Sequence, residues 1–288
     1  MSAGIVDIRI KPPWRDGPED PPVPIPPEYM RYDDVYGFVT LLNMPVPELL
    51  AEMSDNGVGP SILQAEQEWG DYHDWNTRVA EIVTSHSEHF ACGFASVDPR
   101  DGMGAVREID RAYHELGLRG VSFVPGFLRI SPTDALCYPV YAKCAELKIP
   151  VGIHTGINFS AHGSIDNGRP LLVDRVACDF PELTLICHHG GWPWPHEAIA
   201  VAWKHPNVYL EFGAISPRYQ APGASGGWGD VVHFIDTVLR RQVLFGTDWP
   251  MLRYERALAE IQAWDLRDVS YEAYMGGNAQ QLLERILV

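Results

Sequence analysis

The sequence lacks paired cysteines and any long hydrophobic run. It holds five cysteines, an odd number, and no two of them are spaced as Cys-x-x-Cys. Their neighbours are mostly apolar, which is typical of buried, reduced thiols and not of a disulfide framework. No apolar run approaches the roughly 18 residues that cross a bilayer, and the first residues do not follow the basic-then-apolar pattern of a secretory signal. We therefore expect a cytoplasmic protein that does not enter membranes.

Positive charge is also scarce. The chain has 22 Lys and Arg against 38 Asp and Glu, a formal net charge of −16. Such a surface repels nucleic acid and anionic membranes, so neither is an expected partner. We expect a small-molecule substrate instead. If that substrate is an anion, positive charge inside the site must outweigh the field of the whole protein.

Short apolar segments alternate with segments of helical periodicity along the whole chain. We expect strands at residues 4–10, 57–64, 90–97, 119–124, 149–154, 183–186, 207–212 and 242–246. We expect helices at residues 48–56, 76–85, 102–116, 138–148, 171–180, 195–204, 230–240, 255–264 and 279–286. This alternation predicts a parallel (β/α)8 TIM barrel, one domain over residues 1–288. A doubly wound open sheet is the alternative, but no Gly-rich nucleotide fingerprint follows the first strand.

Proline is concentrated between the first strand and the first helix. Residues 11–30 read KPPWRDGPEDPPVPIPPEYM, which excludes helix interior and central strand. Ordered elements flank this stretch and it contains aromatic residues, so we expect an ordered loop over the barrel mouth rather than a disordered linker. Tryptophans in this and other loops could line an aromatic pocket or cap the barrel; they are Trp14, Trp69, Trp192, Trp194 and Trp228.

Two adjacent histidines stand where a buried strand stops. The stretch LTLICHHGGWPW, residues 183–194, begins with four apolar or β-branched residues, followed by Cys187, His188 and His189. Gly190 and Gly191 then break the strand and let a ligand approach the backbone. In a parallel α/β fold this end of a strand is where ligands bind, so we favour function over a structural role for the histidine pair.

Other predicted strands end in polar residues as well. The first strand gives Asp7, Arg9 and Lys11, the fifth His154, the seventh Glu211 and the eighth Asp248. Imidazoles and carboxylates that converge on one mouth match the ligands of zinc or a similar divalent ion. They equally suit acid–base catalysis, with a histidine that works near pH 7. Arg218 lies in a mouth loop, where it could bind a substrate carboxylate or form a surface salt bridge.

Longer motifs resemble one enzyme family. The segments that carry the resemblance are GFASVDP (93–99), ELGLRGV (115–121), IPVGIHTG (149–156), FPELTLICHHGG (180–191), NVYLEFG (207–213), VLFGTDWPM (243–251) and GGNAQQLL (276–283). In this order, and over nearly the whole chain, they are similar to the amidohydrolase-2 group of the amidohydrolase superfamily. Aminocarboxymuconate-semialdehyde decarboxylase belongs to that group.

The resemblance implies a fold, a cofactor and roles for three residues. Members of the group are (β/α)8 barrels, usually with one divalent metal, often zinc, that hydrolyse, decarboxylate or hydrate small and often aromatic-derived acids. By motif match, His154 corresponds to the metal ligand of the fifth strand and His189 to the catalytic histidine. Asp248 corresponds to the aspartate that binds metal and transfers protons. The resemblance also suggests a homo-oligomer.

The first strand departs from the family pattern. The family has Asp-x-His-x-His there, and both histidines bind metal, but this chain has Asp7, Arg9 and Lys11 at those places. Neither Arg nor protonated Lys donates a lone pair. His154 and Asp248, with His189 or Glu211, remain as candidate ligands for zinc. The alternative is that Arg9 and Lys11 replace the metal, pair with Asp248 and receive a carboxylate or a developing oxyanion.

Three hypotheses of function follow. The first is a hydrolase in which His189 is the general acid–base, Asp248 activates water, His154 binds metal or polarises a carbonyl, and Arg9 and Lys11 bind negative charge. In all versions His188, Glu211 and Arg218 are candidate substrate contacts. The second is a decarboxylase, or a hydrolase of β-keto compounds, that works without metal. The products distinguish these two hypotheses, because a decarboxylase releases carbon dioxide whereas a hydrolase adds water to its substrate. The third is a non-catalytic ligand-binding barrel.

Overall fold

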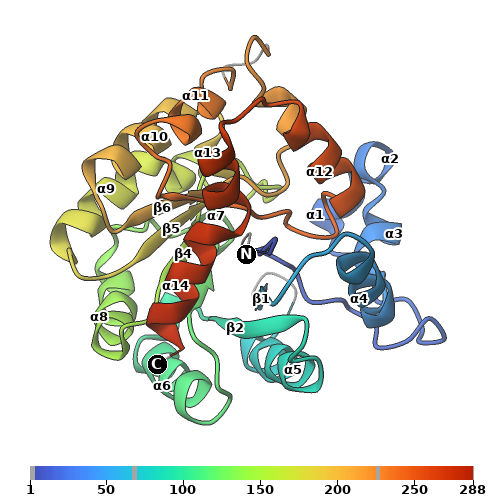
Figure 1. Ribbon diagram of the computed structural model, residues 1–288. Coiled ribbons are helices and arrows are strands. Elements are labelled where there is room, and N and C mark those ends of the chain that lie inside the picture. Colours follow the sequence, from blue (N-terminus) through green and yellow to red (C-terminus); the bar gives the residue numbers. More distant parts are fainter. Residues whose placement is uncertain (1–3, 67–69, 225–227, 288) are drawn as a thin grey trace.

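A seven-stranded parallel sheet forms the centre of the molecule. The computed structural model describes residues 4–66, 70–224 and 228–287. The strands follow one another in chain order around the sheet, each paired in parallel with the next (Figure 1). They are β1 (Ser61–Gln64), β2 (Phe90–Ser96), β3 (Val121–Phe123), β4 (Val151–His154), β5 (Leu185–His188), β6 (Val208–Glu211) and β7 (Val243–Leu244).

The N-terminal segment closes this sheet into a barrel. Ile10 makes parallel bridges both to Leu63, near the end of β1, and to Trp249, beyond β7. The amide of Ile8 donates to the carbonyl of Phe245 at 3.0 Å, and the amide of Asp248 donates to the carbonyl of Arg9 at 2.9 Å. The strand predicted at 4–10 therefore takes its place as isolated bridges in the seam, and the predicted (β/α)8 barrel is confirmed.

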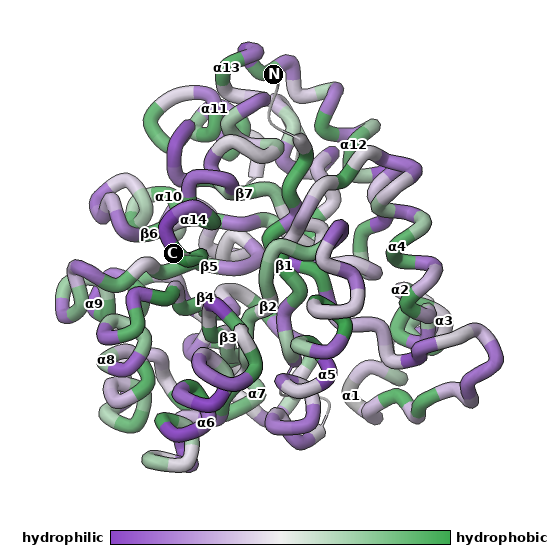
Figure 2. Tube along the Cα trace, turned by 60° about the horizontal axis from the view of Figure 1, so that its bottom comes forward, coloured by the Kyte–Doolittle hydropathy of each residue, from purple (hydrophilic) through white to green (hydrophobic). Residues whose placement is uncertain are grey.

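Helices cover the outside of the barrel, and the predicted ones are all present. They are α4 (Val46–Asp55), α5 (Tyr72–Ser85), α6 (Met103–His114), α8 (Tyr138–Leu147), α9 (Pro170–Asp179), α10 (Pro195–Lys204), α11 (Val231–Asp236), α12 (Tyr254–Gln262) and α14 (Asn278–Ile286). Figure 2 shows hydrophilic and hydrophobic stretches alternating along these helices, as one buried face per helix requires. In the described residues, no helix is both long and apolar enough to cross a membrane.

The two ends of the barrel differ in polarity. At one end the interior is filled by apolar residues of the strands, among them Val6, Ile62 and Ile186, which pack with Leu282 and Ile286 of α14. Figure 1 shows α14 lying across the strands. The opposite end, where the strands reach their C-termini, carries the polar side chains. Inside the barrel, the polar side chains that could bind a ligand are therefore gathered at one mouth.

The Pro-rich stretch forms an ordered cover, as predicted. Its last four residues form the short helix α1 (Pro27–Met30), so the expectation that residues 11–30 contain no helix was wrong at this end, where proline occupies the first helical position. The short helices α2 (Asp33–Tyr36) and α3 (Phe38–Leu42) follow, and the sequence analysis missed all three. Trp14, Tyr29 and Phe38 pack there in an apolar cluster with Phe127, in α7 (Pro125–Leu128), and with Phe159. Phe127 follows β3 and Phe159 follows β4, so this aromatic cap lies over the C-terminal ends of the strands.

The cysteines are free thiols, and all of them are buried except Cys178.

A buried carboxyl group ties the barrel seam together. Asp7 accepts hydrogen bonds from the amide of Arg9 at 2.8 Å, from the hydroxyl and amide of Thr247, and from the hydroxyl of Tyr254 at 3.0 Å. Burial raises the pKa of Asp7 to about 7, against these hydrogen bonds, which lower it. Because the donors come from the two chain segments that meet at the seam, Asp7 holds the barrel closed.

Asp7→Ala tests this role. It leaves several buried donors without an acceptor, so we expect the free energy of unfolding to fall by about 3 kcal/mol in urea titrations. Tyr254→Phe removes one donor and should cost about 1 kcal/mol. Tyr36→Phe, at a half-exposed ring, is the matched control, with an expected change below about 0.5 kcal/mol. Equal losses in all three variants would contradict a specific role for Asp7.

Candidate active site

Most of the polar residues predicted at strand ends meet at the C-terminal mouth. His154 ends β4, His188 ends β5 and Glu211 ends β6. Asp248 follows β7, and Arg9 projects from the seam segment beside it. Arg9, His188, His189, Glu211 and Asp248 are buried and His154 is partly exposed. The structure thus brings together side chains that are distant in the sequence.

Arg9 is the centre of the site. Its Nε lies 2.9 Å from Oδ1 of Asp248, its Nη1 donates to Oε1 of Gln64 at 2.9 Å, and its Nη2 donates to Oε1 of Glu66 at 3.1 Å. Gln64 is itself fixed, because its amide donates to the carbonyl of Ile8 at 2.7 Å. Two hydrogen bonds and one ion pair therefore fix the position of the guanidinium.

Lys11 completes a ring of alternating charges. Its Nζ lies 3.1 Å from Oε1 of Glu66 and 3.4 Å from Oδ1 of Asp248. These are the same two oxygens that face Arg9, so two cations share two carboxylates. The formal charges of the four groups cancel, as burial in a medium of low dielectric demands.

Gln64 and Glu66 were missed by the sequence analysis. Gln64 is the polar last residue of the apolar strand β1, and Glu66 lies two positions further on, which puts both on one side of an extended chain. The rule that selected the ends of the other strands would have found them.

His189 is placed by a sharp turn. Its backbone has φ of 62°, and Gly190 and Gly191 continue the left-handed turn at 58° and 72°. A Cβ on Gly190 would lie 2.1 Å from the ring of Phe212, so only glycine fits. His189 Nδ1 lies 2.8 Å from the carbonyl oxygen of Gly213. Since that oxygen can only accept, Nδ1 carries the proton and Nε2 is left as a basic nitrogen.

The imidazoles at the mouth are neutral. Burial, followed by the positive charge of Arg9, lowers the pKa of both His188 and His189 well below the usual range. Burial and the neighbouring His189, Arg9 and Lys11 do the same for His154, whose ring centre is 4.4 Å from that of His189. The two cations therefore act on all three rings. A neutral His189 is available as a base, and its protonated form is a strong acid.

His188 and Glu211 lie among the buried groups around the site. Nδ1 of His188 is 3.1 Å from Oε2 of Glu211, and the amide of Gly213 donates to the same carboxyl group. Burial raises the pKa of Glu211 to about 8. A Cβ at position 152 would lie 2.2 Å from Nε2 of His188, so Gly152 makes room for the ring. His188 and Glu211 were predicted as substrate contacts. In the structure each of these two side chains is at most 1% exposed.

Some predicted residues lie apart from this group. Arg218 is exposed, and its guanidinium contacts the ring and hydroxyl of its neighbour Tyr219. Trp14 belongs to the aromatic cap, whereas Trp192 is 39% exposed. Trp228 packs on Phe212. Trp194 lies under Arg169, and Trp69 is outside the described residues.

Metal binding at the mouth depends on which donors are available. Arg9 and Lys11 offer no lone pair, and Oδ1 of Asp248 already faces both cations. Among the described residues, a single group of three side chains has its ligand atoms within 4.8 Å of one another, and it lies on the outer helices. In this arrangement, the donors at the mouth do not fit a divalent metal.

Comparison with known proteins gives consistent results over most of the chain. The family model described as Amidohydrolase matches residues 6–285. A gamma-resorcylate decarboxylase from a Polaromonas species is 22% identical over 252 residues, covering 73% of this chain and 74% of that protein. A 2-amino-3-carboxymuconate-6-semialdehyde decarboxylase from Dictyostelium discoideum is 22% identical, covering 72% and 65%. Protein fluG of Emericella nidulans is 28% identical, but the match covers only 26% of this chain and 9% of that protein.

Solved structures share the fold. An uncharacterised TIM-barrel protein from Bordetella bronchiseptica superposes with a TM-score of 0.76 and 25% identity, covering 98% of this chain and 99% of that one. A 5-carboxyvanillate decarboxylase from Novosphingobium aromaticivorans, complexed with manganese and 4-hydroxy-3-methoxy-5-nitrobenzoic acid, has a TM-score of 0.70 at 15% identity and covers 97% and 96%. At that identity the second likeness shows the fold alone.

The neutral state of His189 predicts how stability depends on pH. Its pKa is lowered in the folded protein, so below about pH 6.5 only the unfolded chain takes up this proton. The residue therefore makes the free energy of unfolding fall by about 1.4 kcal/mol per pH unit as the pH drops. His189→Gln should flatten the curve by that amount in urea titrations with a chelator present. Arg218→Gln, which alters no group that titrates in this range, should leave the slope unchanged; an unchanged slope in His189→Gln would contradict a neutral His189.

Proposed function

Because this chain belongs to the amidohydrolase family, we propose that it is a decarboxylase of small, aromatic-derived carboxylic acids that works without a metal. The observation that carries the proposal is the pair Arg9 and Lys11, which supplies two buried positive charges at the mouth. Relatives named as decarboxylases of gamma-resorcylate and of an aminocarboxymuconate semialdehyde support the reaction class.

The cationic pair suits decarboxylation better than hydrolysis. A metal ion lowers the pKa of a bound water and so creates a nucleophile near pH 7. Arginine and lysine cannot coordinate water in that way, but they stabilise an oxyanion through charge-assisted hydrogen bonds. Loss of carbon dioxide needs a place for the electron pair of the broken bond and no activated water. The best substrate therefore carries a hydroxyl or carbonyl oxygen β to its carboxylate.

The steps balance for a hydroxybenzoate. Nε2 of His189 takes the hydroxyl proton, and Arg9 and Lys11 stabilise the phenolate. Protonated His189 then delivers this proton to the ring carbon that bears the carboxylate. The bond from that carbon to the carboxylate breaks, carbon dioxide leaves, and the electron pair returns to the ring as a phenolate, which takes up one proton from solvent. The low pKa of His189 favours the transfer to carbon.

Glu66 occupies the position of an anionic substrate group in this scheme. Its Oε1 is 3.1 Å from both cations, as a substrate oxyanion would be. It lies in the segment after β1, outside any regular strand. We infer that substrate binding displaces Glu66 from Arg9 and Lys11, while Asp248 remains in place to orient them. The local charge thereby stays balanced in the presence and absence of substrate.

Arg9→Met tests the reaction class. A panel of hydroxybenzoates and β-keto acids is screened for carbon dioxide release by the metal-free, chelator-treated protein. On a substrate that reacts, Arg9→Met should lower kcat/KM by about 100- to 1000-fold, because one oxyanion donor is lost. Arg218→Met, at an exposed arginine, is the matched control and should retain activity. Turnover that requires added metal, or that incorporates oxygen from labelled water without release of carbon dioxide, would favour the metal-dependent hydrolase instead.

Glu66→Gln tests the displacement. Without the competing carboxylate the site has an extra positive charge, so KM for an anionic substrate should fall about tenfold, equivalent to roughly 1.4 kcal/mol. The free energy of unfolding should fall as well, because two buried cations then share one carboxylate. A KM that rises or stays constant in a folded Glu66→Gln protein would show that Glu66 does not compete with substrate.

A further inference from the structure

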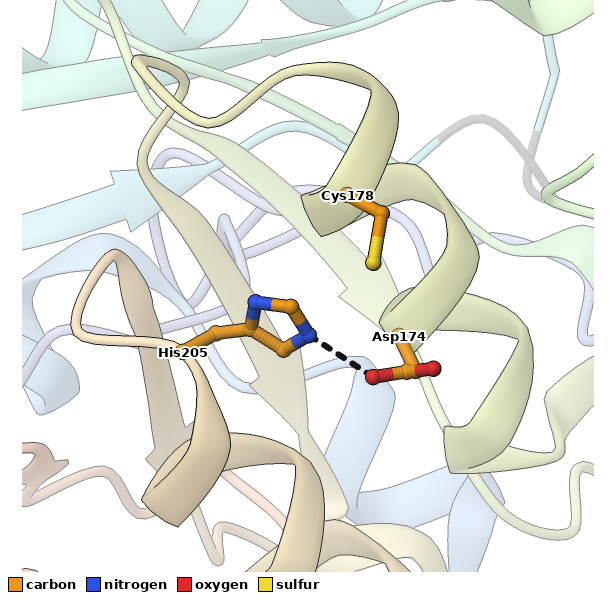
Figure 3. Close-up of side chains that lie close together, drawn as sticks. All are labelled: Asp174, Cys178 and His205. Atoms are coloured by element: carbon orange, nitrogen blue, oxygen red, sulfur yellow. Dashed lines mark hydrogen bonds and ion pairs between the residues drawn. The ribbon is translucent and has the colours of Figure 1, made fainter.

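Three potential metal ligands gather on the outer surface, away from the barrel mouth. Asp174 and Cys178 belong to α9, and His205 follows α10. Figure 3 shows the Cys178 sulfur directed toward the pair formed by Asp174 and His205. Their ligand atoms all lie within 4.8 Å of one another. The proposed reaction does not involve them.

The fold creates this cluster in a simple way. Asp174 and Cys178 are four residues apart on a helix and therefore share one face. Helix α10 packs against α9, so the residue that terminates α10 lies opposite that face. Nε2 of His205 is 2.7 Å from Oδ1 of Asp174, and the side chain of His205 is only 12% exposed. The imidazole is thus held in place, whereas Cys178 is exposed and carries no disulfide.

We propose that Asp174, Cys178 and His205 form a surface site for Zn²⁺ or a similar borderline divalent ion. A thiolate, an imidazole and a carboxylate are the protein ligands that zinc prefers, and hard ions such as Mg²⁺ avoid the thiolate. Binding releases the thiol proton to solvent, so two negative ligands neutralise the ion. Because Cys178 is exposed, water takes the fourth position.

The side chains must adjust slightly to admit the ion. Ligand distances of about 2.0–2.3 Å set tetrahedral ligand atoms roughly 3.5 Å apart. The hydrogen bond from His205 to Asp174 therefore opens, and the sulfur moves closer to both. Most of the movement falls to Cys178, which is exposed and can change its side-chain rotamer.

Lys204 competes for the same place. Its Nζ lies 2.6 Å from Oδ1 of Asp174 and 3.9 Å from the sulfur of Cys178. The ammonium group thus stands where the positive ion would bind. The side chain of Lys204 is 56% exposed, so it can turn into solvent when zinc enters. Removal of Lys204 should strengthen zinc binding, whereas loss of any ligand should weaken it.

This site affects how metal content is interpreted. One zinc per chain in the purified protein would be expected from the outer site alone. Such a count would therefore not identify a metal at the mouth. Only the loss of zinc in a variant at one site or the other assigns it.

The experiment is a zinc titration of the full chain, first stripped with a chelator, in competition with a chromophoric zinc indicator. We expect one ion per chain. Cys178→Ser and His205→Gln should each weaken binding at least tenfold, and Lys204→Ala should tighten it several-fold. His196→Gln is the matched control, because His196 forms another exposed pair with a carboxylate, Asp230, at 3.4 Å, and zinc affinity should not change.

Cobalt(II) provides a second readout. The thiolate-to-cobalt charge-transfer band should appear in the near ultraviolet and disappear in Cys178→Ser, with circular dichroism confirming that the variant is folded. Zinc binding that survives Cys178→Ser and His205→Gln but is lost in Asp248→Asn would overturn the proposal and place the ion at the mouth. The absence of zinc binding in folded wild-type protein would overturn it as well.

Discussion

The ion pair between Arg9 and Asp248 is the interaction on which the rest of the site depends. It joins the first and last strand segments across the seam, where the main chain also pairs. Both groups are buried, so neither tolerates the loss of its partner without a large desolvation penalty. Barrel closure and the positive charge at the mouth are therefore two consequences of the same contact. A variant that removes Arg9 changes both, which is why stability has to be measured beside activity.

Arg9 also acts on the neighbouring histidines. Burial is the main cause that lowers the pKa of His188 and His189, and the positive charge of Arg9 lowers it further. The carbonyl of Gly213 then fixes which nitrogen of His189 carries the proton. A neutral ring with a defined tautomer beside fixed cations is suited to moving a proton while the cations hold the opposite charge.

The sequence predicted the barrel well, because apolar strands and amphipathic helices alternate with clear periods. Strand ends also located His154, His188, Glu211 and Asp248, since the fold alone brings such positions together. The short helices α1–α3 were missed because the sequence around them has no helical periodicity of apolar residues. Their packing depends on the aromatic cap, which forms only in the folded protein. Glu66 was missed because its role depends on Arg9 and Lys11, which are 57 and 55 positions away. Arg218 was selected by its loop position, although its loop carries it to the surface.

Charge conservation links the altered first strand to the proposed chemistry. Where the family resemblance implies two neutral histidines and a divalent ion, this chain has Arg9 and Lys11, which supply the same two positive charges from side chains. Two cationic side chains can stabilise an oxyanion, as a metal ion can. They cannot lower the pKa of a bound water as a metal ion does. With no substrate bound, two buried cations need partners that offset the loss of hydration, and Glu66 and Asp248 are those partners. In the proposed reaction Asp248 stays in place and orients the cations. The exchangeable partner in that proposal is Glu66, which lies beyond the end of β1 and would give up its anionic position to the substrate.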